Sequence, residues 1–247
     1  MMIPNNYDIS KRISNNLMLT VKEVNREIEQ RSLLKHPFYK AWTEGRLTTS
    51  HLKGYSKEYF QLVKSIPQFV QNIYNNKAID DTREEYYHSN YLDSIKQIQQ
   101  EENDHVSMWI NFAVELGVNR KELLEYRGTD DVNQAIRNLN KLSCSSIIHG
   151  ASMMYSLEKE IPKISTTKLE GLEKYYGINN QNAINYFKIH QKVDIEHTKV
   201  WHDILTDYNI NNTRIDEARN EIIKSGILSL ESQNLILDSV CENYIYN

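Results

Sequence analysis

The sequence predicts an all-α protein folded as one helical bundle, and three observations support this. The chain has only 8 glycines and 4 prolines in 247 residues, too few turn formers for a protein of many short strands. Long segments carry apolar residues at the three- and four-residue spacing of a helix face. Several segments exceed the usual three to four turns, which favours a bundle. No linker, low-complexity tract or repeat divides the chain, so residues 1–247 are expected to form a single helical domain with about 15 flexible N-terminal residues.

The first half of the chain is expected to contain three long helices. The first covers residues 17–34. The second begins after the N-cap residues Thr48 to Ser50 and reaches about residue 74, with a bend at Pro67. The third covers about residues 80–116 and ends at Gly117, a residue type that favours helix C-termini.

The second half is expected to contain four more helices. One covers about residues 130–161 and ends at Pro162, and a short one at 166–176 is closed by Gly177. The last two cover residues 180–207 and 213–244. An apolar stripe from Ile222 to Val240 on the last helix predicts core or dimer packing, with a docking surface as the alternative.

Composition excludes several classes of protein. A 40% hydrophobic and 25% charged content is typical of a globular chain, and the net charge of −4 comes without the basic stripe of a nucleic-acid-binding protein. No apolar run approaches the ~20 residues of a membrane helix. Two distant cysteines and the lack of a signal-peptide pattern favour a reducing bacterial cytoplasm, with export to a host left open.

The strongest chemical signal is the triplet His190, Asp194 and His197. On one helix these positions lie within about 60° of each other. Two imidazoles and a carboxylate on one face form a nitrogen-and-oxygen ligand set that suits iron, manganese or zinc. A solvated polar face with incidental histidines explains the triplet equally well.

Two further segments supply possible metal ligands. Either Glu101 or Glu102 could pair with His105, and Glu102 has the Glu-x-x-His spacing of carboxylate-bridged two-metal bundles. The same spacing recurs at residues 84–88, so a charged surface turn is the more economical interpretation of each copy alone. Glu158 follows an apolar helical run, where a glutamate often lies at the solvent edge. The three segments together indicate a metal centre more strongly than any one of them.

Other reactive residue types are expected to be structural. His36 and His149 have no partner at ligand spacing, and the three tryptophans are expected to pack. Cys144 carries no sign of activation and is interpreted as a small buried hydrophobe.

Several segments together resemble a known group of proteins. Leu33–Tyr39, Trp42–Thr48 and Tyr55–Phe60 look like the opening of the TenA/PqqC superfamily. The remaining blocks are closer to its chlamydial death-domain-associating protein (CADD) branch, namely Glu101 to Gly117, Glu158 to Ile164, Gly171 to Gly177 and His190 to His197. The resemblance extends over roughly residues 30–205, in order and with few gaps.

The resemblance implies a heme-oxygenase-like helical domain, usually a homodimer, with a di-iron or manganese–iron centre that activates oxygen. By position, the family's metal ligands correspond to Glu101, His105, Glu158, His190, Asp194 and His197. The family's first glutamate–histidine pair can be two turns apart, and here the spacing is one turn. The choice between Glu101 and Glu102 therefore stays open.

The resemblance also implies synthesis of 4-aminobenzoate, a folate precursor, from side chains of the protein itself. The consumed tyrosine corresponds to Tyr39 and the amino-donating lysine to Lys168. From the residues alone, Tyr39 would be assigned to core packing and Lys168 to solvent. Tyr55 and Tyr59 could flank the centre and relay an electron, although packing is the simpler expectation.

Two other functions remain as alternatives. A metal-free cofactor-biosynthesis enzyme of the TenA/PqqC type would have no need of the six-ligand set, which favours the metal-dependent oxidase. A protein that binds a host death domain is the second alternative, and the sequence shows no distinct docking surface for it.

Overall fold

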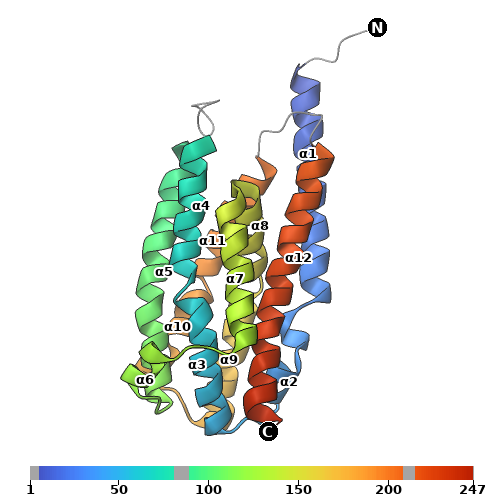
Figure 1. Cartoon of the computed structure of the whole chain (residues 1–247). Helices are drawn as coiled ribbons and strands as arrows, with labels where there is room; N and C mark the ends of the chain where they lie inside the picture. Colours follow the sequence, from blue (N-terminus) through green and yellow to red (C-terminus); the bar gives the residue numbers. More distant parts are fainter. Residues whose placement is uncertain (1–5, 81–88, 208–214, 247) are drawn as a thin grey trace.

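Long helices run side by side in the computed structural model, which describes residues 6–80, 89–207 and 215–246 (Figure 1). All regular structure within these ranges is helical, as the composition and periodicity predicted. The elements are α1 (Asn6–Gln30), η1 (Leu33–Lys35), α2 (Pro37–Thr43), α3 (Thr49–Val63), α4 (Ile66–Asp80), α5 (Ser89–Glu115), α6 (Arg120–Glu125), α7 (Asp130–Ser145), α8 (Ile147–Glu158), α9 (Ile161–Tyr176), α10 (Gln181–His190), α11 (Val193–Thr206), α12 (Ile215–Val240) and the π-helical η3 (Cys241–Ile245).

Helix α8 is the inner helix of the bundle. Every one of its residues except His149 is buried, and it packs against α12, α11, α7 and α4. Apart from His149, its residues before Glu158 are apolar, aromatic or small, so the helix has no broad polar face to present to water. The helix ends at Glu158, which is therefore carried into the interior and does not lie at the solvent edge.

Helix α12 completes the bundle against α8, α7 and α1. Its apolar residues Ile222, Leu230 and Leu237 are buried within this one chain. The stripe predicted on this helix is thus core packing. The buried residues form one hydrophobic cluster that draws on the whole set of long helices, so the fold is a single helical domain.

Three predicted long helices are each split in two, two of them at a serine-rich segment or before a proline. The helix expected over 130–161 breaks at Ser146, whose backbone is extended (φ −155°, ψ 171°). Serines at 143, 145 and 146 offer the backbone competing hydrogen bonds, which weakens helix at this point. The helix expected over 49–74 breaks before Ile66, and Pro67 lies in the first turn of α4, where its missing N–H costs nothing.

Proline 162 begins a helix where the sequence predicted an end. It occupies the first turn of α9, which therefore starts at Ile161 and not at residue 166. The helix expected over 180–207 breaks at residues 191–192, between α10 and α11. Likewise, α1 covers Asn6–Gln30 and not 17–34, while the short helices α2 and α6 were not predicted.

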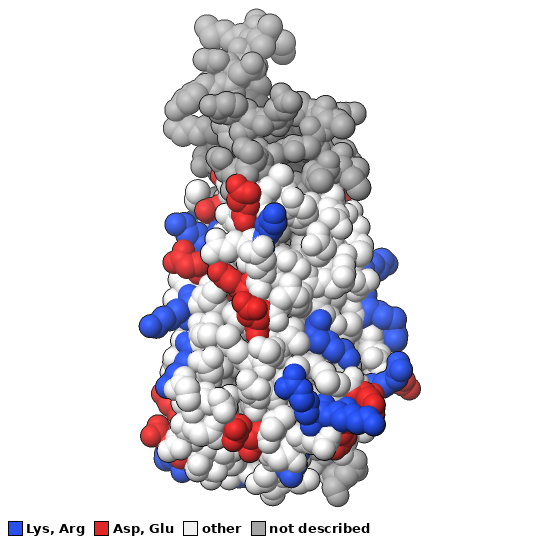
Figure 2. Space-filling model, turned by 90° about the vertical axis from the view of Figure 1, so that its left-hand side faces the viewer, with Lys and Arg blue, Asp and Glu red and all other residues white. Residues whose placement is uncertain are grey.

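The predicted helix ends at capping residues are confirmed. The Thr48 side chain accepts a hydrogen bond from the His51 N–H at the start of α3. Gly177 ends α9 in the left-handed conformation, with φ of 66°. The face of the molecule in Figure 2 carries acidic and basic side chains interspersed with uncharged ones. No helix in the described part of the chain is long and apolar enough to span a bilayer.

Candidate metal centre

Six buried side chains from four helices converge in the interior of the bundle. They form two groups, and within each group one possible ligand atom per residue lies within 4.8 Å of the others. The first group is Glu102, His105 and His190, and the second is Glu102, Glu158, Asp194 and His197. Glu102 belongs to both groups, so its carboxylate has the position that a bridging ligand would need.

The two histidines of α10 and α11 present free nitrogens to this cluster. His190 Nδ1 lies 2.7 Å from the Tyr186 carbonyl oxygen, which leaves Nε2 available as a ligand. Burial lowers the pKa of His190 to about 4, so its imidazole is neutral. His197 directs Nδ1 at three carboxylates, 3.5 Å from Glu102, 3.6 Å from Asp194 and 3.9 Å from Glu158.

The three carboxylates crowd one another in a dry interior. Burial, followed by repulsion from neighbouring carboxylates, raises the pKa of Glu158 and of Asp194 well above the ordinary range. Glu158 Oε1, Asp194 Oδ2 and His197 Nδ1 are buried and have no hydrogen-bond partner among the described residues. Unpaired buried acceptors facing one point are costly unless a cation lies between them. This donor set fits a pair of first-row metal ions.

Glu101 lies outside both groups. Its Oε2 is 2.8 Å from Nε2 of His197, on the outer edge of the ring, and its side chain is 34% exposed. The resemblance pointed to Glu101 as the ligand, whereas the geometry places Glu102 inside the cluster. On α5, His105 is three residues after Glu102, so both side chains turn toward α10 and α11.

Lys168 lies in a buried aromatic pocket beside this cluster. The lysine is 3% exposed, and its Nζ donates a hydrogen bond to the Tyr55 hydroxyl. Its Nζ is 4.9 Å from the ring centroid of Tyr59, 5.0 Å from that of Tyr55 and 5.7 Å from that of Tyr39. The expectation of a solvated lysine was wrong, because the face of α9 that carries Lys168 packs against α10 and α2.

Burial changes the protonation of the pocket. It lowers the pKa of Lys168 to about 7, so a large share of the amine is neutral near neutral pH. It raises the pKa of Tyr39 well above the ordinary range, so that phenol stays protonated. Burial, and then the charge of Asp194, also raises the pKa of Tyr59. Tyr59 thus connects the lysine pocket electrostatically with the carboxylate cluster.

The remaining candidates have structural environments. His36 caps α2 and bonds to Asp238, and His149 bonds to Ser146. The tryptophans at 42, 109 and 201 are fully buried, as predicted. Cys144, predicted to be buried, is exposed, because α7 turns it away from the core. The repeated motif at residues 84–88 lies outside the described residues.

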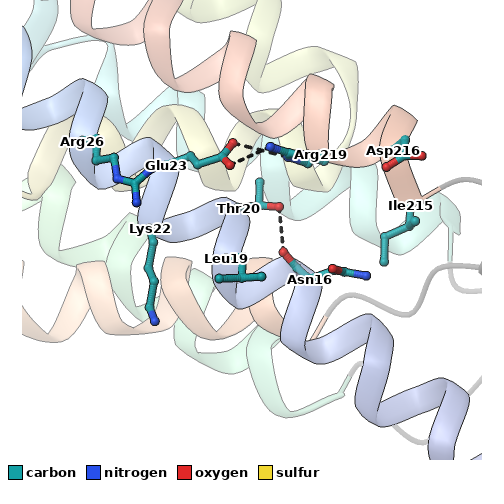
Figure 3. A pocket seen from close by; sticks show the side chains of 9 residues that line it. All are labelled: Asn16, Leu19, Thr20, Lys22, Glu23, Arg26, Ile215, Asp216 and Arg219. Carbon is teal, nitrogen blue, oxygen red and sulfur yellow. Dashed lines mark hydrogen bonds and ion pairs between the residues drawn. The ribbon is translucent and has the colours of Figure 1, made fainter.

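A surface hollow of about 200 Å³ lies between α1 and α12 (Figure 3). An ion pair between Glu23 and Arg219 crosses it, and Thr20 bonds back to its own helix. None of the candidate site residues lines this hollow. The candidate site residues therefore lie in the buried cluster and the lysine pocket, away from this hollow.

A family comparison supports the chemistry that the donor set suggests. The sequence profile of a family described as "Iron-containing redox enzyme" matches residues 55–224, which include all six clustered side chains and Lys168. The chain belongs to this family. The family's description gives a reason for the buried histidines and carboxylates of this chain, since such a set of side chains can hold a metal.

Two curated relatives of this family member carry the same name. A 4-aminobenzoate synthase of Nitrosomonas europaea is 25% identical over 231 residues, covering 92% of each chain. A 4-aminobenzoate synthase of Chlamydia trachomatis is 27% identical over 173 residues, covering 70% of this chain and 73% of the relative.

Solved structures confirm the heme-oxygenase-like fold of this chain. A Shewanella denitrificans domain described as having that fold superposes with a TM-score of 0.70, at 15% identity, over 98% of this chain and 94% of the other. A CADD-like protein of unknown function from Nostoc punctiforme gives a TM-score of 0.68, at 14% identity, over 93% and 98% of the two chains. Both superpositions agree with the fold that the resemblance implied.

Two residues around the site were not assigned a role from the sequence. Tyr186 stacks on His190 with ring centroids 4.0 Å apart, and Trp201 donates a hydrogen bond of 2.8 Å to Glu158 Oε2. Tyr186 could have been found, since it is one helical turn before His190 on the same face. Trp201 could have been found in the same way, four residues after His197.

Proposed function

We propose that this chain is an oxygen-activating di-metal oxidase that makes 4-aminobenzoate from its own Tyr39 ring and Lys168 nitrogen. The observation that carries the proposal is the buried Lys168 amine, enclosed by tyrosine rings directly beside a candidate metal centre. A lysine without a carboxylate partner is costly to bury, which favours a chemical role. The names of the two curated relatives support the same product.

The metals would be held by the six clustered residues, with Glu102 as the bridge. Two irons, or one manganese and one iron, suit this set of imidazoles and carboxylates. When bound, such a pair supplies oxidising power from molecular oxygen. Elemental analysis of anaerobically purified protein tests this part, with about two ions per chain expected.

The chain's own residues would prepare the two reacting groups. The low pKa of Lys168 leaves its amine a nucleophile near neutral pH, and its hydrogen bond to Tyr55 orients the nitrogen. The Tyr39 hydroxyl is buried without a well-formed hydrogen bond among the described residues, and it interacts with the Tyr55 hydroxyl, which contacts Lys168. The surrounding aromatic rings exclude water from both groups.

Isotope labelling tests the origin of the product. Protein grown with ring-labelled tyrosine and ¹⁵N-lysine, then exposed to oxygen and a reductant, should release 4-aminobenzoate that carries both labels. Free labelled amino acids added to unlabelled protein should leave the product unlabelled. Lys168→Arg should release no product, whereas Lys163→Arg, which alters an exposed lysine of the same helix, should behave as wild type. Unlabelled product from labelled protein contradicts the proposal.

Self-consumption predicts a limit on yield. Each chain can release one molecule of product and is then spent, since Tyr39 occurs once. A yield well above one per chain from an added small molecule would leave an ordinary oxygenase on this scaffold. The homodimer, a host death-domain partner and a cytoplasmic location remain predictions, and size-exclusion chromatography with light scattering tests the first of these.

A further inference from the structure

An unbroken file of oxidisable rings runs from the candidate ligand His190 to the protein surface. After His190 it consists of Tyr186, Trp109, Tyr55, Trp42, Tyr176 and Tyr175. Successive ring centroids are 4.0, 4.9, 5.7, 6.0, 5.7 and 6.3 Å apart. Each ring is therefore in contact with the next, although the residues come from five helices.

The composition of this file differs from that of the surrounding core. Each of the six rings beyond His190 is a tyrosine or a tryptophan, the two aromatic side chains that lose a single electron most readily. Phenylalanine occurs beside the file, at Phe38, Phe112 and Phe187, but at no position within it. Packing alone would be served equally well by phenylalanine, and more cheaply where a hydroxyl or N–H is buried.

The two ends of the file differ in exposure. Trp109, Tyr55 and Trp42 are fully buried, whereas Tyr175 is 41% exposed at the end of α9. The Trp42 ring packs directly against the backbone of Gly171 in the middle of the file. A Cβ at position 171 would collide with the ring's Nε1, so this contact requires glycine. That Nε1 is buried without a hydrogen-bond partner among the described residues, a cost that packing does not explain.

We infer that this file conducts single electrons from a one-electron donor in solution, at Tyr175, to the metal centre at His190. The inference rests on the proposed oxidase function, because oxygen reduction by the centre requires electrons from outside. Each ring passes one electron to its inner neighbour and regains one from its outer neighbour. The donor is oxidised by one electron and the centre is reduced by one. Because Nζ of Lys168 lies at the Tyr55 hydroxyl, the neutral form of this amine can accept the phenolic proton when Tyr55 is oxidised and return it when Tyr55 is reduced.

A photochemical experiment on metal-free protein tests the file independently of catalysis. A ruthenium polypyridyl photo-oxidant is attached through Lys174→Cys, beside Tyr175, in a Cys144→Ser background that removes the exposed cysteine. A light flash with an electron-accepting quencher makes the label a strong oxidant. We expect a transient tryptophan-radical absorption as the oxidising equivalent moves inward to Trp42.

Three variants decide the result. Tyr176→Phe keeps the ring packing but removes the oxidisable step, and should abolish the tryptophan signal. Trp42→Phe should abolish it as well, while Tyr126→Phe, which alters a tyrosine outside the file, should leave it intact. An undiminished signal in folded Tyr176→Phe protein, checked by circular dichroism, overturns the inference. Inward transfer in metal-free protein together with no aromatic product from metal-loaded protein would support the file and reject the proposed function.

Discussion

The Nε2 atom of His197 lies 2.8 Å from Oε2 of Glu101, on the side of the imidazole that faces away from the buried carboxylates. Its Nδ1 atom faces Glu102 at 3.5 Å. The two adjacent glutamates therefore contact opposite edges of one ring. Glu101 accepts a hydrogen bond from Nε2–H of His197, which fixes the tautomer whose Nδ1 is free to bind a metal. Glu102 lies on the Nδ1 side, where it belongs to both ligand groups.

This arrangement predicts different losses for the two glutamates. Glu102→Gln should reduce metal content for both ions, because Glu102 belongs to both ligand groups. Glu101→Gln should keep about two ions per chain with an affinity about 10–100-fold weaker, the usual effect of losing an outer partner of a ligating histidine. Anaerobic equilibrium dialysis with elemental analysis measures both quantities. Equal loss of ions in the two variants would make Glu101 a ligand.

Metal binding should reverse the effect of changing Asp194 on stability. In metal-free protein, Asp194→Asn removes one of several crowded buried carboxylates and should raise the free energy of unfolding. In metal-loaded protein the same substitution removes a ligand and should lower the free energy of unfolding. The reason is that wild type gains about 2.7 kcal/mol of stability from a metal at 100 times its Kd. Urea denaturation with and without metal measures the change. If Asp194→Asn changed the free energy of unfolding in the same direction with and without metal, the assignment of Asp194 as a metal ligand would be contradicted. Full metal content in His197→Ala would contradict the assignment of the metal site independently.

Residue spacing singled out His190, Asp194 and His197, which the structure brings into the candidate cluster, although part of the reasoning was wrong. His190, Asp194 and His197 were predicted to share the face of one helix, but α10 ends at His190, and Asp194 lies in the first turn of α11. The interruption is only two residues long, and all three side chains still lie in the candidate cluster. The choice between Glu101 and Glu102 could not be made from spacing, since either can lie on the inner face, and only the packing of α11 against α5 decides it.

Burial was the property that single residues predicted least well. Lys168 was expected in solvent because lysine is seldom buried, and only the tertiary packing of α9 against α10 and α2 encloses it. Cys144 was expected in the core because free cysteine is often buried, and it is exposed. In both cases the residue type gives only an average, and the rotation of the helix about its axis determines the outcome.

The buried amine of Lys168 predicts a specific dependence of stability on pH. Burial lowers its pKa from 10.5 in the unfolded chain to about 7. Between these values the unfolded chain binds a proton that the folded chain lacks, so stability rises with pH. Below about pH 7 the cost of burying the charge is present in full.

The free energy of unfolding of wild type, relative to Lys168→Met, should therefore rise by about 1.4 kcal/mol per pH unit above about pH 7. Urea denaturation at a series of pH values measures this difference. Lys163→Met, which removes an exposed lysine of the same helix, serves as the matched control and should keep the wild-type pH dependence. A flat difference between wild type and Lys168→Met would show that the buried lysine keeps its ordinary pKa.

Cys144 should be dispensable. The residue is exposed on α7 and belongs to neither ligand group nor to the lysine pocket. Cys144→Ala should change the free energy of unfolding by less than about 0.5 kcal/mol, as is usual for surface substitutions. Product yield per chain should equal that of wild type. A folded but inactive Cys144→Ala protein would favour a thiol-dependent enzyme of the TenA type.

The three tyrosines around Lys168 allow the consumed ring to be identified. By distance from Nζ alone, Tyr59 and Tyr55 are nearer to the nitrogen than Tyr39. Tyr55 is occupied by its hydrogen bond to Lys168, and Tyr59 is the ring that interacts with Asp194. Tyr39 has a buried hydroxyl without a well-formed hydrogen bond in the described part of the chain, and it is the tyrosine to which the family resemblance points, so we expect it to be the ring that reacts.

Tyr39→Phe should therefore bind metal at the wild-type stoichiometry and yield no 4-aminobenzoate, because the ring it leaves lacks the oxygen that makes a phenol oxidisable. With a small reductant that reaches the metals without the file of rings, Tyr55→Phe and Tyr59→Phe should yield less product than wild type but more than none, since they change the orientation of Lys168 and the contact with Asp194 while the Tyr39 ring remains. Peptide mass mapping after reaction should find the loss of mass at residue 39 in wild type and in both of these variants. Product from Tyr39→Phe, with the loss of mass moved to residue 55 or 59, would assign the consumed ring to that tyrosine and leave the role of Lys168 unchanged.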